Sequence, residues 1–560
     1  MRTILFILSL FVMIGCENSP KADLVILNGN IYTVDENQPL VEAVAVTGNK
    51  ISYVGEEKGA KKLIGDQTSV IDLQGKTMTP GLIESHAHFL GIGYSKMNLD
   101  MLYITSYEEL VSMVEDAVKK AEPGEWITGR GWHQSKWDSI SGENIKGFPT
   151  HHMLSAVSPD NPVWLSHASG HAGFTNAKAM EIAGVDKNTV FEEGGEIIKD
   201  ENGNPTGIFN ESAGGLITRY LPEQDESSDR KAFSLAMEEC LKEGIVGFHD
   251  AGVKRETIDL YKEKLDKGEM KLRMYGMLGG YDKTLLNEFY EKGPEIGLGN
   301  HFLTLRSIKL FCDGALGSRG AWLLEPYSDR PDHIGHSTGD TEYIYQTSVE
   351  ALKNGFQVCI HAIGDRANRE VLNQYERAMQ EVPGVSEHRF RIEHAQHLSK
   401  EDIPRFSELG IIASMQAIHM SSDRPWAIKR LGEERILEGA YVWQKLLNTG
   451  AVIINGTDAP VEPVSAINCF YASVSRRTLK GNPPGGFEPD QKMTREQALR
   501  SYTLDAAYGS FEEDIKGSIE VGKLADFTIF SNDIMTIPED DILDLEVMMT
   551  VIDGKVVYKK

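Results

Sequence analysis

Residues 79–89 read TPGLIESHAHF and place His86 and His88 at the end of an apolar run that is typical of a β-strand. Side chains alternate along a strand, so both imidazoles point to the same side. Histidine is the commonest metal-binding side chain near neutral pH, and two imidazoles at one strand end can share a metal ion. An isolated pair is weak evidence, because two surface histidines can have this spacing by chance.

The middle of the chain repeats this arrangement of an apolar run followed by a polar side chain. His361, His394 and Asp458 each follow a separate run, in FQVCIHAIGD, FRIEHAQHL and AVIINGTDAP. Helix-like segments such as TEYIYQTSVEALKNG separate the runs, which indicates parallel β/α units. We expect a (β/α)8 barrel of the TIM type over residues 81–510, because reactive residues of that fold lie at the carboxyl ends of its strands.

Both ends of the chain have a different, β-rich texture. Residues 23–80 and 511–560 contain short apolar runs separated by Asn-Gly, Gly-Lys and Asp-Gly turns. We expect one small β-sandwich domain built from both ends, and the alternative is two separate caps on the barrel. Around residues 100–230 the β/α pattern loosens, which predicts an inserted subdomain that forms a wall or lid.

Length and charge limit the function classes. A chain of 560 residues predicts one large domain with a smaller companion. The net charge of −26 argues against nucleic acid and anionic membrane surfaces as partners. A small molecule is the expected partner, and whether the chain forms a homo-oligomer is left open.

The first sixteen residues, MRTILFILSLFVMIGC, have the layout of a secretory signal. The apolar run is too short to span a membrane as a helix, and its ending resembles a bacterial lipobox. We expect residues 1–15 to be removed, Cys16 to carry lipid, and residues 16–22 to tether an exported protein to a bacterial membrane. The alternative is a plain signal peptide. The other cysteines lie in apolar stretches without metal-binding spacing and are expected to be buried free thiols.

Taken together, these motifs resemble the amidohydrolase superfamily, and within it the YtcJ-like branch that includes N-substituted formamide deformylases. The resemblance covers nearly the whole mature chain. It rests on TPGLIESHAH, SIKLFCDGALGSRGAWL, IHAIGDRAN, RIEHAQHL, NGTDAPV and GSIEVGKLADFTI. It implies a (β/α)8 barrel and a β-sandwich, and the sequence pattern described above is compatible with both.

The resemblance also implies a set of metal ligands. His86 and His88 would hold one divalent ion with Asp458, and His361 and His394 would hold a second. Lys309, in SIKLF, matches a lysine that is carboxylated in related enzymes and bridges two ions. An ammonium cannot bind a cation, whereas a carbamate supplies two anionic oxygens. The alternatives are that Lys309 is a salt-bridged structural lysine and that Asp313 or nothing bridges the ions.

The implied activity is hydrolysis of a C–N bond, of the amide or N-substituted formamide type, in a small molecule. A bound metal ion lowers the pKa of water and makes hydroxide available near neutral pH, and Asp458 would act as the catalytic proton acceptor and donor. Two zinc ions suit the His/Asp set, although iron or manganese fit nearly as well. The alternatives are a non-catalytic solute-binding lipoprotein and a one-metal deaminase or isomerase.

Four further residues are candidates for substrate binding. Trp132 lies in the aromatic segment GRGWHQSKW. The alternative is that it is a packed core residue. His171 precedes a stretch that can also be read as a capped helix start. Arg319 follows the Gly-rich segment GALGS, which lacks the Lys-Ser/Thr of a phosphate-binding loop, and His419 lies in MQAIHMSSD.

Overall fold

The computed structural model describes residues 21–137, 142–191, 194–222 and 225–560. The predicted signal of residues 1–15 and the predicted lipidation of Cys16 lie outside these residues and stay predictions. Within the described part of the chain, no helix is long and apolar enough to cross a membrane. The cysteines at positions 240, 312, 359 and 469 are buried free thiols, as the sequence predicts.

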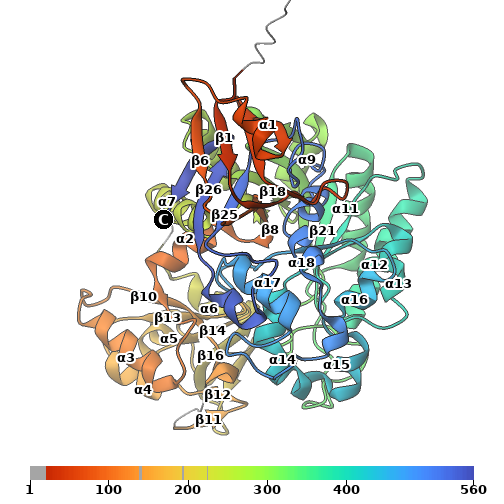
Figure 1. The fold of residues 1–560 in the computed structure, drawn as a ribbon. Coiled ribbons are helices and arrows are strands. Elements are labelled where there is room, and N and C mark those ends of the chain that lie inside the picture. Colours follow the sequence, from red (N-terminus) through yellow and green to blue (C-terminus); the bar gives the residue numbers. More distant parts are fainter. Residues whose placement is uncertain (1–20, 138–141, 192–193, 223–224) are drawn as a thin grey trace, which may run out of the picture.

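Eight parallel strands form a nearly closed barrel at the centre of the molecule (Figure 1), so the expected (β/α)8 architecture is confirmed. Neighbouring strands pair in the order in which they occur in the chain. Their side chains are almost all buried, because helices such as α11 (Thr341–Asn354) and α12 (Asp365–Glu381) cover the outside. The strands are β8 (Leu82–Ala87), β17 (Ile245–Val253), β18 (Arg273–Gly279), β20 (Leu303–Phe311), β21 (Gln357–Ala362), β22 (Arg391–His394), β23 (Ile412–Met415) and β24 (Ile453–Asn455).

The first and last barrel strands meet just beyond their carboxyl ends. The Asp458 N–H donates to His86 O at 2.8 Å, and the His88 N–H donates to Ala459 O at 2.7 Å. The segment after β24 therefore lies directly beside the two histidines of β8.

The β-rich ends of the chain form one sandwich, as expected. One sheet combines β2 (Asn30–Tyr32), β3 (Leu40–Val41) and β7 (Thr77–Pro80) with β25 (Phe527–Phe530), β26 (Val547–Ile552) and β27 (Lys555–Lys559). The second sheet contains β1 (Leu24–Leu27), β4 (Ala43–Thr47), β5 (Lys50–Gly55) and β6 (Ser69–Asp72). Ile26, Val44, Phe527 and Val551 share one hydrophobic core between the sheets, which joins the two ends of the chain.

The inserted subdomain, between β8 and β17, contains a separate sheet of parallel and antiparallel strands with its own hydrophobic core. Its strands are β9 (Leu99–Asp100), β10 (Ile127–Trp132), β13 (Val163–His167), β14 (Ala172–Thr175), β15 (Gly195–Lys199) and β16 (Pro205–Glu211). Helices α3 (Tyr107–Val118), α4 (His152–Val157) and α5 (Ala177–Ala183) pack in the same subdomain, at the lower left of Figure 1. Leu110, Trp132, Phe174 and Ile208 belong to its core.

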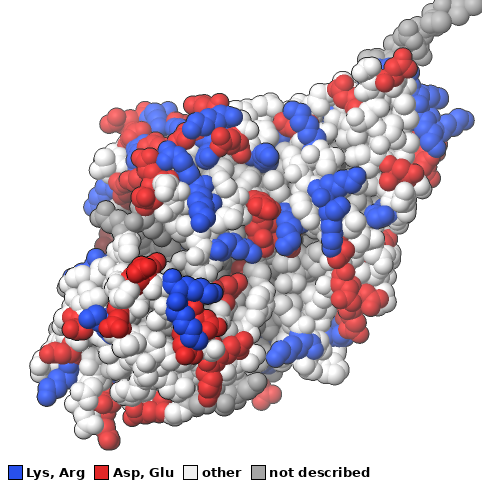
Figure 2. All heavy atoms as spheres, turned by 90° about the vertical axis from the view of Figure 1, so that its left-hand side faces the viewer, with Lys and Arg blue, Asp and Glu red and all other residues white. Residues whose placement is uncertain are grey.

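Charged side chains are mixed on the surface in Figure 2, where acidic and basic residues lie interspersed over the face shown. Many of the described charges are paired, such as Arg230 with Glu263 at 2.7 Å and Lys262 with Glu295 at 2.7 Å.

Candidate metal centre

Six of the predicted functional side chains converge at the carboxyl end of the barrel. His86 lies in β8, Lys309 in β20, His361 in β21 and His394 at the end of β22, while Asp458 follows β24. His419 lies in helix α14 (Ala417–Leu431), which begins directly after β23. Parallel strands all point the same way, so residues at their carboxyl ends are brought to one end of the barrel.

His86, His88 and Asp458 form one group of side chains that could bind a metal ion. Their ligand atoms all lie within 4.8 Å of one another. His86 Nε2 is 3.7 Å and His88 Nε2 is 3.4 Å from Asp458 Oδ1. The His86 side chain is completely buried, whereas the His88 side chain is 41% exposed, so this group is reachable from solvent on the side of His88.

His394, His419 and Asp458 form a second such group. His419 Nε2 is 4.0 Å from Asp458 Oδ2, so the two oxygens of one carboxylate face two different groups. His361 lies beside His394, with 4.5 Å between ring centroids, but its Nε2 is 3.5 Å from Asp313 Oδ1. The structure thus brings His419, expected on the substrate side, into the ligand cluster and leaves His361 next to it.

Lys309 is buried against the first group. Its Nζ is 3.2 Å from His86 Nε2, and burial lowers the pKa of this lysine. Asp313 has a different environment, because its carboxylate accepts hydrogen bonds from the backbone N–H groups of Ile363, Gly364 and Trp322 at 2.8–3.0 Å. Both candidates for a bridging anion thus lie beside a candidate ligand, Lys309 beside His86 and Asp313 beside His361, but Asp313 also holds backbone.

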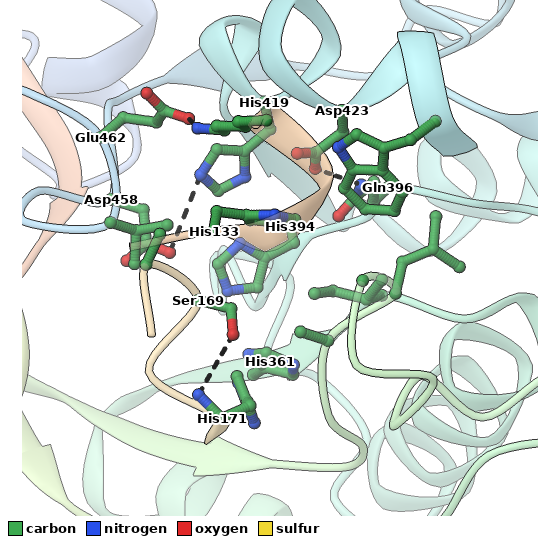
Figure 3. A pocket seen from close by; sticks show the side chains of 18 residues that line it. His133, Ser169, His171, His361, His394, Gln396, His419, Asp423, Asp458 and Glu462 are labelled. Atoms are coloured by element: carbon green, nitrogen blue, oxygen red, sulfur yellow. Dashed lines mark hydrogen bonds and ion pairs between the residues drawn. The ribbon is translucent and has the colours of Figure 1, made fainter. Parts of the chain in front are cut away.

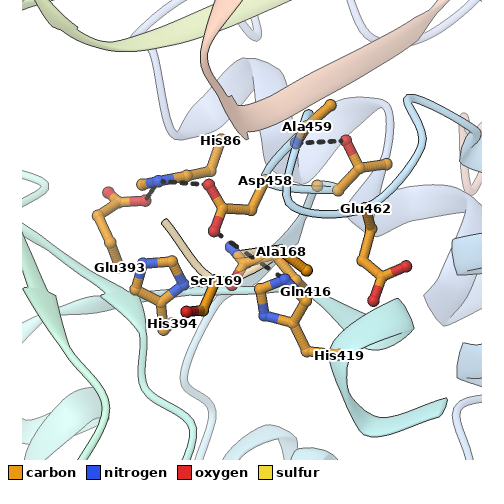
Figure 4. A network of polar contacts seen from close by, with 12 residues as sticks. His86, Ala168, Ser169, Glu393, His394, Gln416, His419, Asp458, Ala459 and Glu462 are labelled. Carbon is orange, nitrogen blue, oxygen red and sulfur yellow. Dashed lines mark hydrogen bonds and ion pairs between the residues drawn. The ribbon is translucent and has the colours of Figure 1, made fainter. Parts of the chain in front are cut away.

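Two polar side chains orient His86 and His394 by binding the Nδ1 atom of each ring. Glu393 accepts a hydrogen bond from His86 Nδ1 and is itself paired with Arg391 at 2.7 Å. Gln416 Oε1 is 2.7 Å from His394 Nδ1. Figure 4 shows His86 between Glu393 and Asp458. With Nδ1 occupied in both rings, Nε2 keeps its lone pair for a ligand at the centre of the site, an arrangement common around metal ions.

The donor set fits a divalent cation. Burial lowers the pKa of His361 and of His394 well below the ordinary value, which favours the neutral imidazole that a metal ion binds. Burial would raise the pKa of Asp458, but the His88 side chain, with Nε2 3.4 Å from Oδ1, and the other nearby histidines hold it well below its usual range. His361 Nε2, His419 Nε2 and Asp458 Oδ1 are buried without a hydrogen-bond partner among the described residues. Buried polar atoms are rarely left unpaired, and a metal ion would satisfy them.

A pocket opens onto this cluster (Figure 3). The inserted subdomain supplies part of its wall, as the sequence predicts for a wall or lid. His171, from that subdomain, lies 5.8 Å from the His361 ring and is hydrogen bonded through Nδ1 to Glu211 Oε2 at 2.9 Å. Other side chains of the wall are His133, Lys136, Ser169, Leu316, Ile363, Gln396, Asp423, Trp426, Val461 and Glu462.

Two of the predicted substrate-side residues are not on this wall. Trp132 is fully buried in the insertion core, where its indole N–H donates to Leu165 O at 2.8 Å, and the next residue, His133, lines the cavity. Arg319 is paired with Asp329 at 2.9 Å. His171 and His419 do line the cavity. Asn176 caps helix α5, so the alternative of a helix start after His171 also holds.

Sequence comparison places these residues in a known family. Residues 69–558 match the model of the amidohydrolase family. The chain is 31% identical to the YtcJ protein of Bacillus subtilis, over 95% of this chain and 98% of that protein. It is 27% identical to the N-substituted formamide deformylase of Arthrobacter pascens, over 96% of this chain and 98% of that protein.

A solved structure gives the same result for the fold. The crystal structure of an uncharacterized metal-dependent hydrolase from Pyrococcus horikoshii is 27% identical and superimposes with a TM-score of 0.73, covering 92% of this chain and 99% of that chain.

Proposed function

This chain belongs to the amidohydrolase family, and we propose that it is a metal-dependent hydrolase that cleaves a C–N bond, of the amide or N-substituted formamide type, in a small molecule. The proposal rests on the position of the Asp458 carboxylate, whose two oxygens face two different histidine groups at 3.4–4.0 Å. The name of the Arthrobacter pascens relative supports the bond type.

His86, His88 and Asp458 would hold one divalent ion, and His394 with His361 or His419 would hold a second. Zinc suits these nitrogen and oxygen donors. When bound, the ions would polarise the scissile carbonyl and lower the pKa of a water molecule. Lys309 would carry a carbamate: burial favours its neutral amine, the form that reacts with carbon dioxide, and the anionic product would face the cations.

The residues of the chain account for the proton transfer. The water oxygen adds to the carbonyl carbon, and one of its protons moves to Asp458. Asp458 then gives this proton to the leaving nitrogen as the C–N bond breaks, so the products are a carboxylic acid and an amine. Glu393 and Gln416 hold the imidazoles of His86 and His394 throughout. The inserted subdomain lines the pocket on the side of His171.

The test is turnover of a panel of amides and N-substituted formamides by protein of known metal content. We expect hydrolysis that is lost on treatment with a chelator and restored by zinc. Tight binding of panel members without hydrolysis by the metal-loaded protein would favour the solute-binding alternative instead.

A further inference from the structure

Helix α14 presents His419, Asp423 and Trp426 to the cavity in succession. Residues three and four apart share one face of a helix. With a rise of about 1.5 Å per residue, Asp423 lies roughly 6 Å and Trp426 roughly 10 Å beyond His419 along the helix axis. His419 is the member of this row beside Asp458, and Figure 3 shows Asp458 and Asp423 on opposite sides of the histidines. A substrate with its scissile bond at Asp458 would therefore extend toward Asp423.

Asp423 forms no ion pair within 4.0 Å among the described residues, although the positive charges of His419 and Lys136 act on it from farther away and favour a lower pKa. Its oxygens accept hydrogen bonds from Gln396 Nε2 and Ser422 Oγ, both at 3.2 Å, and both donors are neutral. Burial raises the pKa of this carboxyl group. The other carboxylate of the wall, Glu462, is paired with Lys136 at 3.0 Å. Asp423 is partly exposed in the pocket wall. Removing a carboxylate that has no ion pair from water is costly, and a cation brought by a ligand would offset this cost.

Trp426 offers a second feature that suits a cation. The face of an indole ring attracts positive charge, more strongly where water is excluded. The Arg430 guanidinium carbon lies 5.7 Å from the centre of this ring, but the guanidinium is already paired with Asp329 and donates to Gly317 O. Apolar Leu316 and Ile363 line the same cavity and suit a hydrocarbon chain.

We propose that the substrate is an amide or N-substituted formamide with a second, positively charged nitrogen, such as an N-acyl derivative of a small diamine, and that Asp423 and Trp426 bind this cation. The position of the scissile bond rests on the proposed function, whereas the binding of the cation does not.

The experiment compares three compounds of similar length on the metal-loaded protein. N-Formylputrescine carries an ammonium group, N-pentylformamide has a methyl group in its place, and N-formyl-γ-aminobutyrate ends in a carboxylate. Binding is measured by calorimetry and hydrolysis by release of formate. We expect the cationic compound to be preferred over the neutral one by about 10- to 100-fold, since hydrogen bonds to charged groups are worth this much.

The Asp423→Asn variant should reduce this preference to less than about threefold, and Trp426→Leu should reduce it partly. Ser422→Ala is the matched control, because it removes one hydrogen bond to Asp423 and leaves the charge, so the preference should remain. The preference is a ratio within one protein sample, so partial unfolding of a variant cancels.

Equal affinity for the cationic and neutral compounds, preference for the anionic one, or binding of none would overturn the inference. So would a preference that survives in Asp423→Asn. Preferential binding of the cationic compound without formate release would leave the inference standing and contradict the proposed hydrolase.

Discussion

The Glu84 carboxylate accepts hydrogen bonds from Thr457, with its oxygens 2.8 and 3.0 Å from the backbone nitrogen and 2.8 Å from Oγ1. Glu84 lies two residues before His86, and Thr457 directly precedes Asp458. This buried contact therefore fixes the two segments that carry the first group of candidate ligands. Gly456 leaves the space for it, because an added Cβ would lie only 2.2 Å from Glu84 Oε1.

Replacing Glu84 with Gln should lower both metal content and turnover. The amide keeps only one acceptor oxygen, so the Thr457 backbone N–H and hydroxyl lose part of their acceptors. This shifts Asp458 and costs about 1–3 kcal/mol of stability for unsatisfied buried groups. Metal analysis, turnover and thermal unfolding of the variant measure these effects. Thr457→Ser keeps the hydroxyl and is the control that should resemble the unchanged protein. Full metal loading and turnover in Glu84→Gln would show that the contact is dispensable.

The Asp458→Asn variant should lose turnover by a factor on the order of 10² to 10⁴, the usual contribution of general acid–base catalysis, with a further loss if metal is also lost. Asparagine keeps the volume of the side chain but removes its charge and its capacity to accept the proton. Initial rates and metal content of the same sample separate the two effects. Asp259→Asn, on the exposed side of helix α8 (Arg255–Asp266), is the matched control. Near-normal rates in Asp458→Asn would exclude the role given to this residue.

Lys309→Ala should reduce the number of bound metal ions and abolish turnover, with partial rescue by short carboxylic acids that fill the vacated anion position. Asp313→Ala should keep the metal ions but lower the melting temperature, because three backbone N–H groups lose their acceptor. Metal analysis and thermal unfolding of both variants test this pair. The opposite pattern would assign the bridging role to Asp313 and leave Lys309 structural.

We also propose that the protein is exported and anchored through lipid on Cys16. Stable anchoring needs more than one acyl chain, which a diacylglyceryl group on the cysteine supplies. Expression of the full gene in bacteria should place the protein in the membrane fraction, and Cys16→Ser should release it. If both forms are equally soluble, the anchor does not exist.

The barrel could be predicted because several of its strands are apolar runs with a polar residue at or just after the end, as in FQVCIHAIGD and AVIINGTDAP. The shared sandwich followed from the matching textures of the two chain ends. The sheet of the insertion was less visible, since β9 and β10 are short or contain glycines, as in ITGRGW.

At the candidate site, the sequence identified the ligands at strand ends, placed His419 only on the substrate side, and missed Glu393 and Asp423. His419 lies on a helix, so its place beside His394 depends on how α14 packs. Glu393 lies inside the quoted motif RIEHAQHL, and a carboxylate within an apolar strand is a signal that could have identified it. Asp423 carries no such signal, because an acidic residue in a helix usually faces solvent.

Anomalous X-ray diffraction from crystals of the zinc-loaded protein tests the metal centre most directly. We expect two zinc peaks per chain, one among His86, His88 and Asp458 and the other beside His394. The position of the second peak would also show whether His361 or His419 completes that site. An absence of zinc at these residues, in protein that still hydrolyses its substrate, would contradict the proposed two-metal centre.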